Sequence, residues 1–82
     1  MEETKIEHLK GLSVINATKH LMLKYDLNHE DAYKKLLHTE TYKILMESDS
    51  GLFLESDSYL TVALDSELEK NKEALYDFIS NN

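Results

Sequence analysis

Apolar residues recur along most of the chain at the three- and four-residue spacing of an amphipathic helix. Between Lys5 and Tyr25 this spacing places a set of residues on one face, and between Tyr59 and Ile79 a second set falls within roughly 100° around a helix axis. A shorter stripe predicts another helix that ends near Leu37. The first set is Val14, Ala17, Thr18, Leu21, Met22 and Tyr25, and the second is Leu60, Leu64, Leu68, Leu75, Phe78 and Ile79.

Polar residues between these stretches predict where helices begin and where the chain turns. Asn28 is the expected N-cap of the second helix, because its side chain can accept a backbone N–H and acidic residues follow in the first turn. Ser56 or Ser58 is the expected N-cap of the last helix. The run Glu47-Ser48-Asp49-Ser50-Gly51 predicts a reversal of the chain in which Gly51 has a positive φ.

These patterns predict an all-α fold, a small bundle of about four helices that forms a single domain over residues 1–82. A short, buried third segment whose type stays open is expected at residues 42–46, and a short extended segment is expected near residues 52–54. The last helix is expected to be the longest, and it is either continuous or broken near residue 65, where Ser66 and Glu69 could form a capping box. The expected core consists of Val14, Leu21, Tyr25, Leu36, Tyr42, Leu45, Leu60, Leu64 and Leu68.

The composition narrows the class of protein. With 41% apolar and 30% charged residues, the 82-residue chain resembles an ordinary globular protein of one domain. No apolar run exceeds three residues, whereas a membrane helix needs roughly 18 to 20. The acidic, polar start does not resemble a secretory signal, and the chain has no cysteine for disulfides or thiolate chemistry. We therefore expect a cytoplasmic protein without a membrane segment.

The charge distribution disfavours nucleic acid as a partner. The formal net charge is -7, and residues 42–82 carry only three lysines against nine acids. The chain has no arginine, although DNA-binding proteins use basic residues to neutralise phosphates and arginine to recognise guanine. The alternative to a protein-binding role is a DNA-associated dimeric regulator that uses the lysines of the first helix.

Neither the histidines nor the acidic segments have the spacing of a metal site. His8, His20, His29 and His38 are too far apart to form the i, i+4 pair of a zinc-binding helix. The tetrapeptide Glu-Ser-Asp-Ser occurs at residues 47–50 and 55–58, but neither copy has the ligand positions of a calcium loop. No nucleophile elbow or glycine-rich phosphate loop is present either. We expect no catalytic residues, no cofactor and no metal.

Four acidic residues in the predicted last helix are the candidate functional site. Asp65, Glu69, Glu73 and Asp77 follow each other at i, i+4, and like charges at this spacing repel each other by a few tenths of a kcal/mol per pair. A solvated helix face explains this pattern as well. The functional hypothesis is that these residues, called here the acidic line, bind another protein, in particular a basic one. Association of the chain as a homodimer stays open.

A set of spaced residues resembles a known family. These residues lie within positions 14–69, and they resemble the small uncharacterised bacterial proteins of the domain of unknown function DUF3791. That family has no established activity and no accepted catalytic residues to carry over, and the resemblance suggests an antitoxin-like or regulatory partner of another protein. We therefore expect a non-enzymatic protein-interaction module. The residues that carry the resemblance are Lys24-Tyr25-Asp26-Leu27-Asn28-His29-Glu30-Asp31-Ala32, Thr41-Tyr42, Leu45, Gly51-Leu52, Glu55-Ser56, Tyr59-Leu60, Leu64 and Glu67-Leu68.

Overall fold

The computed structural model describes residues 2–81, and the two ends of the predicted domain, Met1 and Asn82, lie outside this range. The fold is all-α, as predicted, with five α-helices, two 3-10 helices and no strand among the described residues. No helix within residues 2–81 combines the length and the apolar composition that crossing a bilayer requires. The elements are α1 (Glu3–Tyr25), α2 (His29–Leu37), α3 (Glu40–Met46), η1 (Ser48–Ser50), η2 (Leu52–Leu54), α4 (Asp57–Glu69) and α5 (Lys72–Ser80).

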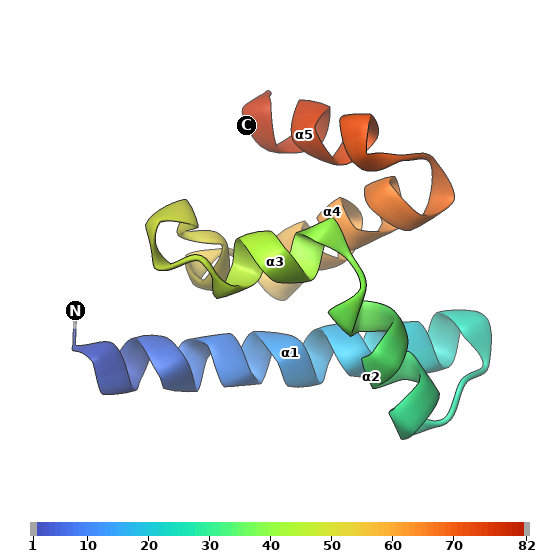
Figure 1. The fold of residues 1–82 in the computed structure, drawn as a ribbon, viewed down its shortest axis with the longest axis horizontal. Helices are drawn as coiled ribbons and strands as arrows, with labels where there is room; N and C mark the ends of the chain where they lie inside the picture. Colours follow the sequence, from blue (N-terminus) through green and yellow to red (C-terminus); the bar gives the residue numbers. More distant parts are fainter. Residues whose placement is uncertain (1, 82) are drawn as a thin grey trace.

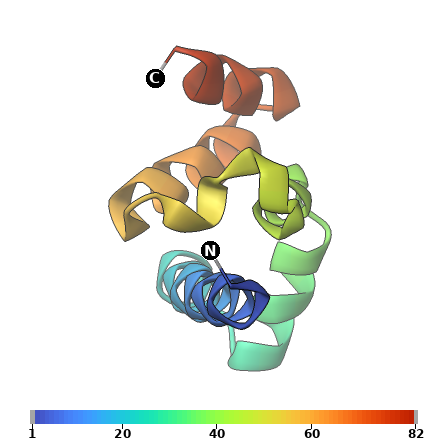
Figure 2. The same cartoon turned by 90° about the vertical axis from the view of Figure 1, so that its left-hand side faces the viewer.

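The helices are stacked in three levels. In Figure 1, α1 lies along one side of the molecule, α3 and α4 form the middle, and α5 lies on the far side of α4. Helix α2 packs beside the C-terminal part of α1 and leads the chain up to α3. Figure 2, which looks nearly along α1, shows the same order, with η1 and η2 connecting α3 to α4. Helix α4 therefore packs against α1 on one side and α5 on the other.

The core lies where α1, α2, α3, η2 and α4 meet, and it confirms the apolar pattern of the sequence. Leu21, Leu36, Leu45, Leu60 and Leu64 of the predicted core are buried. The other four predicted residues are partly buried and pack against this cluster. They are Val14, Tyr25, Tyr42 and Leu68.

The predicted caps and the predicted turn are also confirmed. Asn28 Oδ1 accepts the Asp31 N–H at 2.8 Å, and Ser56 Oγ accepts the Tyr59 N–H at 3.1 Å. Gly51 connects η1 to η2 with a φ of 69°, in the left-handed region that glycine adopts without steric cost. Thr39 is the N-cap of α3, and its hydroxyl accepts the Tyr42 N–H at 3.0 Å.

Two predictions about the second half of the chain are wrong in detail. Residues 52–54 form the 3-10 helix η2 and not an extended segment, because Leu54 N–H donates to the Gly51 carbonyl at 3.0 Å. The expected last helix is two helices, α4 and α5, so the longest helix is α1, with 23 residues. The break lies at Lys70 and Asn71, where Asn71 Oδ1 accepts the Ala74 N–H at 2.8 Å and caps α5.

Candidate functional site

The break between α4 and α5 divides the acidic line. Asp65 and Glu69 lie on α4, whereas Glu73 and Asp77 lie on α5. The four carboxylates are therefore not on one continuous helix, and the premise of three consecutive i, i+4 repulsions is wrong. Glu73 and Asp77 are exposed, but Asp65 and Glu69 are paired with residues of α1.

A row of polar pairs, called here the α1–α4 seam, joins α1 to α4. Asn16 Nδ2 donates to Asp57 Oδ1 at 3.0 Å, and His20 Nε2 lies 2.8 Å from Asp65 Oδ1. One turn further along α1, Lys24 Nζ lies 3.1 Å from Asp65 Oδ1 and also pairs with Glu69. The order of the pairs shows that the two helices run in the same direction. Half of the acidic line therefore serves to hold α4 against α1.

Ionisation of the seam follows these contacts. Partial burial opposes the charge of Asp65, but the hydrogen bonds from His20 and Lys24 together outweigh it and hold the Asp65 pKa below its ordinary value. The hydrogen bond to Glu69 raises the pKa of Lys24, against a smaller effect of desolvation, and Asp65 adds to the increase. Each shift favours the charged form of its group, so Lys24 and Asp65 form an ion pair at neutral pH.

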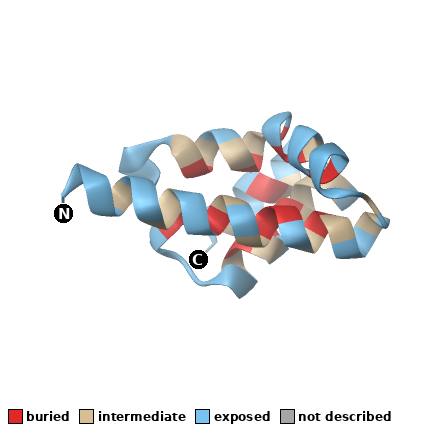
Figure 3. Cartoon of the chain, turned by 90° about the horizontal axis from the view of Figure 1, so that it is seen from below, coloured by how far each residue is buried: buried red, intermediate tan, exposed pale blue. Residues whose placement is uncertain are grey.

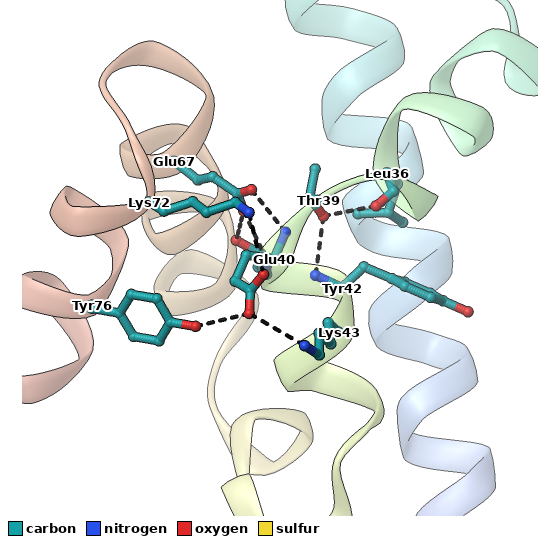
Figure 4. A network of polar contacts seen from close by, with 9 residues as sticks. Leu36, Thr39, Glu40, Tyr42, Lys43, Glu67, Lys72 and Tyr76 are labelled. Atoms are coloured by element: carbon teal, nitrogen blue, oxygen red, sulfur yellow. Dashed lines mark hydrogen bonds and ion pairs between the residues drawn. The ribbon is translucent and has the colours of Figure 1, made fainter.

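A second polar network joins α3 to α4 and α5 (Figure 4). The Glu67 carboxylate accepts the backbone N–H groups of Glu40 and Thr41 at 2.7 and 2.8 Å, and the Thr41 hydroxyl at 2.7 Å. These N–H groups belong to the first turn of α3, where no carbonyl of the same helix can accept them. Glu67 therefore caps α3 from another helix and fixes the position of α3 on α4.

Glu40 extends the same network to α5. Its Oε1 accepts the Tyr76 hydroxyl at 2.8 Å, and its carboxylate lies 3.8 Å from Lys72 Nζ and 4.0 Å from Lys43 Nζ (Figure 4). The Tyr76 hydrogen bond lowers the pKa of Glu40 more than any other contact, and the same bond raises the pKa of Tyr76. The network stabilises the packing of α5, and its carboxylates are occupied by contacts within the chain.

Three large apolar side chains on the outer side of α1 are exposed to solvent. Leu12, Ile15 and Leu23 are 44%, 51% and 87% exposed. At 3.6 residues per turn they fall on the side of α1 opposite the buried Ala17 and Leu21. Figure 3 views the molecule from the α1 side, where exposed positions recur along the helix. We call Leu12, Ile15 and Leu23 the outer face of α1.

Two open pockets lie on the surface. The larger, of about 470 Å³, is lined by residues 37–40, Tyr42, Lys43 and Met46, around the joint between α2 and α3. The smaller, of about 330 Å³, lies between α1 and η2 and continues onto the start of α4. Its lining combines four large apolar residues with two uncharged polar residues and two acidic ones. It is lined by Leu9, Leu12, Ser13, Asn16, Phe53, Leu54, Glu55 and Asp57.

The histidines occupy separate places in the fold. His20 is part of the α1–α4 seam, His29 stacks on Tyr33 of its own helix, and His38 is the C-cap residue of α2. Nowhere in residues 2–81 do three or more histidine, aspartate or glutamate side chains form a cluster that could hold a metal ion.

Sequence reasoning missed the outer face of α1, although the sequence contains its signal. Leu12, Ile15 and Leu23 do not fit the stripe that runs through Ala17 and Leu21. A helix with one buried stripe and further large apolar residues opposite it has more apolar surface than a single contact can bury. The acidic edge of the smaller pocket was missed for another reason, because Glu55 and Asp57 were compared only with the ligand positions of a calcium loop.

Comparisons of the chain with models of protein families, with curated proteins and with solved structures found no match.

Proposed function

We propose that this chain is a non-enzymatic protein-interaction module that binds another protein through the outer face of α1. The observation that carries the proposal is the exposure of Leu12, Ile15 and Leu23 on one side of a single helix. Isolated exposed apolar residues are ordinary, but several on one helix face are typical of a surface that a partner covers. Burial of such side chains would supply the main favourable free energy of binding.

The polar contacts support a binding role and not a catalytic one. Asp65 is held by His20 and Lys24, Glu67 caps α3, and Glu40 bonds Tyr76. Each of these groups joins two helices, so its position is explained by the stability of the fold. The free carboxylates are on the surface, where they favour encounter with a partner of opposite charge.

The net charge of -7 favours a basic partner. Glu73 and Asp77, the half of the acidic line that stays exposed on α5, would contribute to attracting such a partner. An antitoxin-like or regulatory role is proposed on the resemblance to DUF3791 alone. A cytoplasmic location is likewise proposed from the composition, which lacks cysteine.

The alternative, a DNA-associated dimer that uses the lysines of α1, receives less support. Lys10 Nζ donates to the Met46 carbonyl at 2.8 Å and to Ser48 Oγ at 2.9 Å, and Lys24 is paired in the α1–α4 seam. A lysine that already has an acceptor gains less from a phosphate than a free one does. This leaves Lys5 and Lys19 as the lysines of α1 best placed to meet DNA.

Site-specific photo-crosslinking in cells tests the proposal. A photoreactive phenylalanine analogue replaces Ile15 on the outer face of α1, and in a matched variant it replaces Tyr33, an exposed aromatic residue of α2. We expect one defined covalent adduct with a basic protein from position 15 and none from position 33. Equal labelling from both positions, or no adduct at position 15, would contradict the proposal. An adduct with a second copy of the chain would mean that the outer face of α1 forms a homodimer and does not bind a basic partner.

A further inference from the structure

The smaller pocket combines an apolar wall with carboxylates at its edge. Leu54 of η2 is 59% exposed and Leu12 of α1 is 44% exposed, and both line the pocket together with the buried Phe53. We call this pocket the α1–η2 groove. Its volume of about 330 Å³ is at the lower end of the range of ligand clefts, so it has room for one or two side chains and not for a large ligand.

The charged residues that line the α1–η2 groove are all acidic. Glu55 and Asp57 line it and are exposed, whereas no lysine or histidine is among its lining residues. Asp57 accepts a hydrogen bond from Asn16 at 3.0 Å, which fixes its carboxylate at the rim. The nearest lysine on this part of α1, Lys10, lies over the Phe53 ring at 5.5 Å and donates its hydrogen bonds to residues 46 and 48.

The shape of the groove indicates what kind of segment fits it. Its α1 wall consists of Leu9, Leu12, Ser13 and Asn16, which spans seven residue steps, about 10 Å along the helix. This length matches two turns of a docked helix, in which apolar side chains enter the groove and flanking cationic side chains reach Glu55 and Asp57. An acidic segment, or a second copy of this acidic chain, would bring like charges together at the rim.

We infer that the α1–η2 groove binds a basic amphipathic segment of another protein, with leucine-like side chains against Leu12 and Leu54 and lysine or arginine against Glu55 and Asp57. The inference deepens the proposed function and rests on it, because it names the chemical class of the partner. The groove adjoins the outer face of α1 through Leu12, so a helix seated in it continues onto that face.

A peptide titration followed by NMR tests the inference on the whole chain. The probe is a short synthetic peptide in which leucines recur every three to four residues among lysines. We expect saturable shifts of the backbone amides around Leu12, Asn16 and Leu54, and binding that weakens as salt screens the rim charges. Two control peptides replace all lysines by glutamate or all leucines by serine, and neither should bind.

Matched variants distinguish binding in the groove from non-specific attraction of a basic peptide to an acidic protein. Leu54→Ser and Glu55→Lys should each weaken binding about fivefold or more, whereas Val62→Ser and Glu30→Lys should change it by less than about twofold. Val62, which is 46% exposed on α4, lies outside both the groove and the outer face of α1, and Glu30→Lys makes the same charge change on α2. All four positions are exposed, so preserved amide dispersion is expected in each variant.

Three results would overturn the inference: no saturable binding of the leucine–lysine peptide, shifts centred on another surface, or equal weakening by Glu55→Lys and Glu30→Lys. Failure here is distinguishable from failure of the proposed function. If the peptide does not bind in the groove but a crosslink forms from position 15, the chain binds its partner through the outer face of α1 and not through the groove.

Discussion

Within residues 2–81, two residues have a left-handed backbone conformation, and only one of them is a glycine, which adopts it without steric cost. Gly51 has a φ of 69° between η1 and η2, and Asp26 has a φ of 52° at the C-cap of α1. The glycine was predictable because it ends a run of turn-forming residues. Asp26 was predictable only as part of a connection, because aspartate adopts this conformation less often than glycine and more often than most residues.

Alanine substitution of the two glycines should change stability in opposite directions. A Cβ at Gly51 meets no atom within 4 Å, so the expected loss of about 1 kcal/mol comes from backbone strain alone. Gly11 lies inside α1 and also has open space, so Gly11→Ala should raise the free energy of unfolding by about 1 kcal/mol through helix propensity. Urea unfolding measures both. Stabilisation by Gly51→Ala would show that the turn does not require a positive φ.

At the scale of the helices, the sequence predicted the type of secondary structure better than the residues at which helices begin and end. Apolar spacing continues from Leu64 through Leu68 to Leu75 with little disturbance, so periodicity alone favoured one long helix. The structure ends α4 at Glu69 because Asn71, the one residue that interrupts the apolar line, caps a new helix. Leu52–Leu54 posed a different difficulty, because a three-residue apolar run between turns fits a strand, a loop or a 3-10 helix equally well.

Removing the charge of Glu67 should loosen α3 in particular. Glu67→Gln keeps the size of the side chain but replaces one acceptor oxygen by a donor amide that faces N–H groups, so at least one of three bonds is lost. We expect a loss of about 1 to 3 kcal/mol in the free energy of unfolding and faster amide exchange at residues 40 and 41. Glu73→Gln on exposed α5 is the control and should stay within about 0.5 kcal/mol. Comparable losses in both variants would mean that Glu67 contributes no more than a surface charge.

For the whole molecule, the fold class and most of the core followed from the sequence, whereas the polar contacts between helices did not. Periodicity identifies the side of a helix that is buried, but it does not say which helix covers it. The pairs of the α1–α4 seam join residues 41 to 45 positions apart, and the bonds of Glu67 span 26 and 27 positions. Half of the acidic line therefore looked free in the sequence, because its partners, His20 and Lys24, lie on a helix whose place in the fold was unknown.

The α1–α4 seam should make the free energy of unfolding depend on pH in the acidic range. Because its contacts hold the Asp65 pKa below the unfolded value, folding favours the ionised carboxylate. The stabilisation from Asp65 is therefore complete above the ordinary carboxyl pKa of about 4, and it is lost as the pH falls through the lower pKa of the folded state. Asp65→Asn should lower the free energy of unfolding by about 1 kcal/mol at neutral pH, and its difference from wild type should shrink below about pH 4.

Thermal or urea unfolding between neutral and acidic pH measures this difference, and the comparison with wild type is essential. Protonation of other carboxylates also changes stability. It stabilises the fold by relieving repulsion in a chain of net charge -7, and it destabilises the fold by weakening contacts such as the hydrogen bond between Glu40 and Tyr76. Subtracting the Asp65→Asn profile from that of wild type removes these shared contributions. Asp77→Asn, at an exposed position of α5, should show a small difference that stays flat with pH. A wild-type minus Asp65→Asn difference that persists unchanged in acid would mean that Asp65 stabilises the fold through packing and not through its charge.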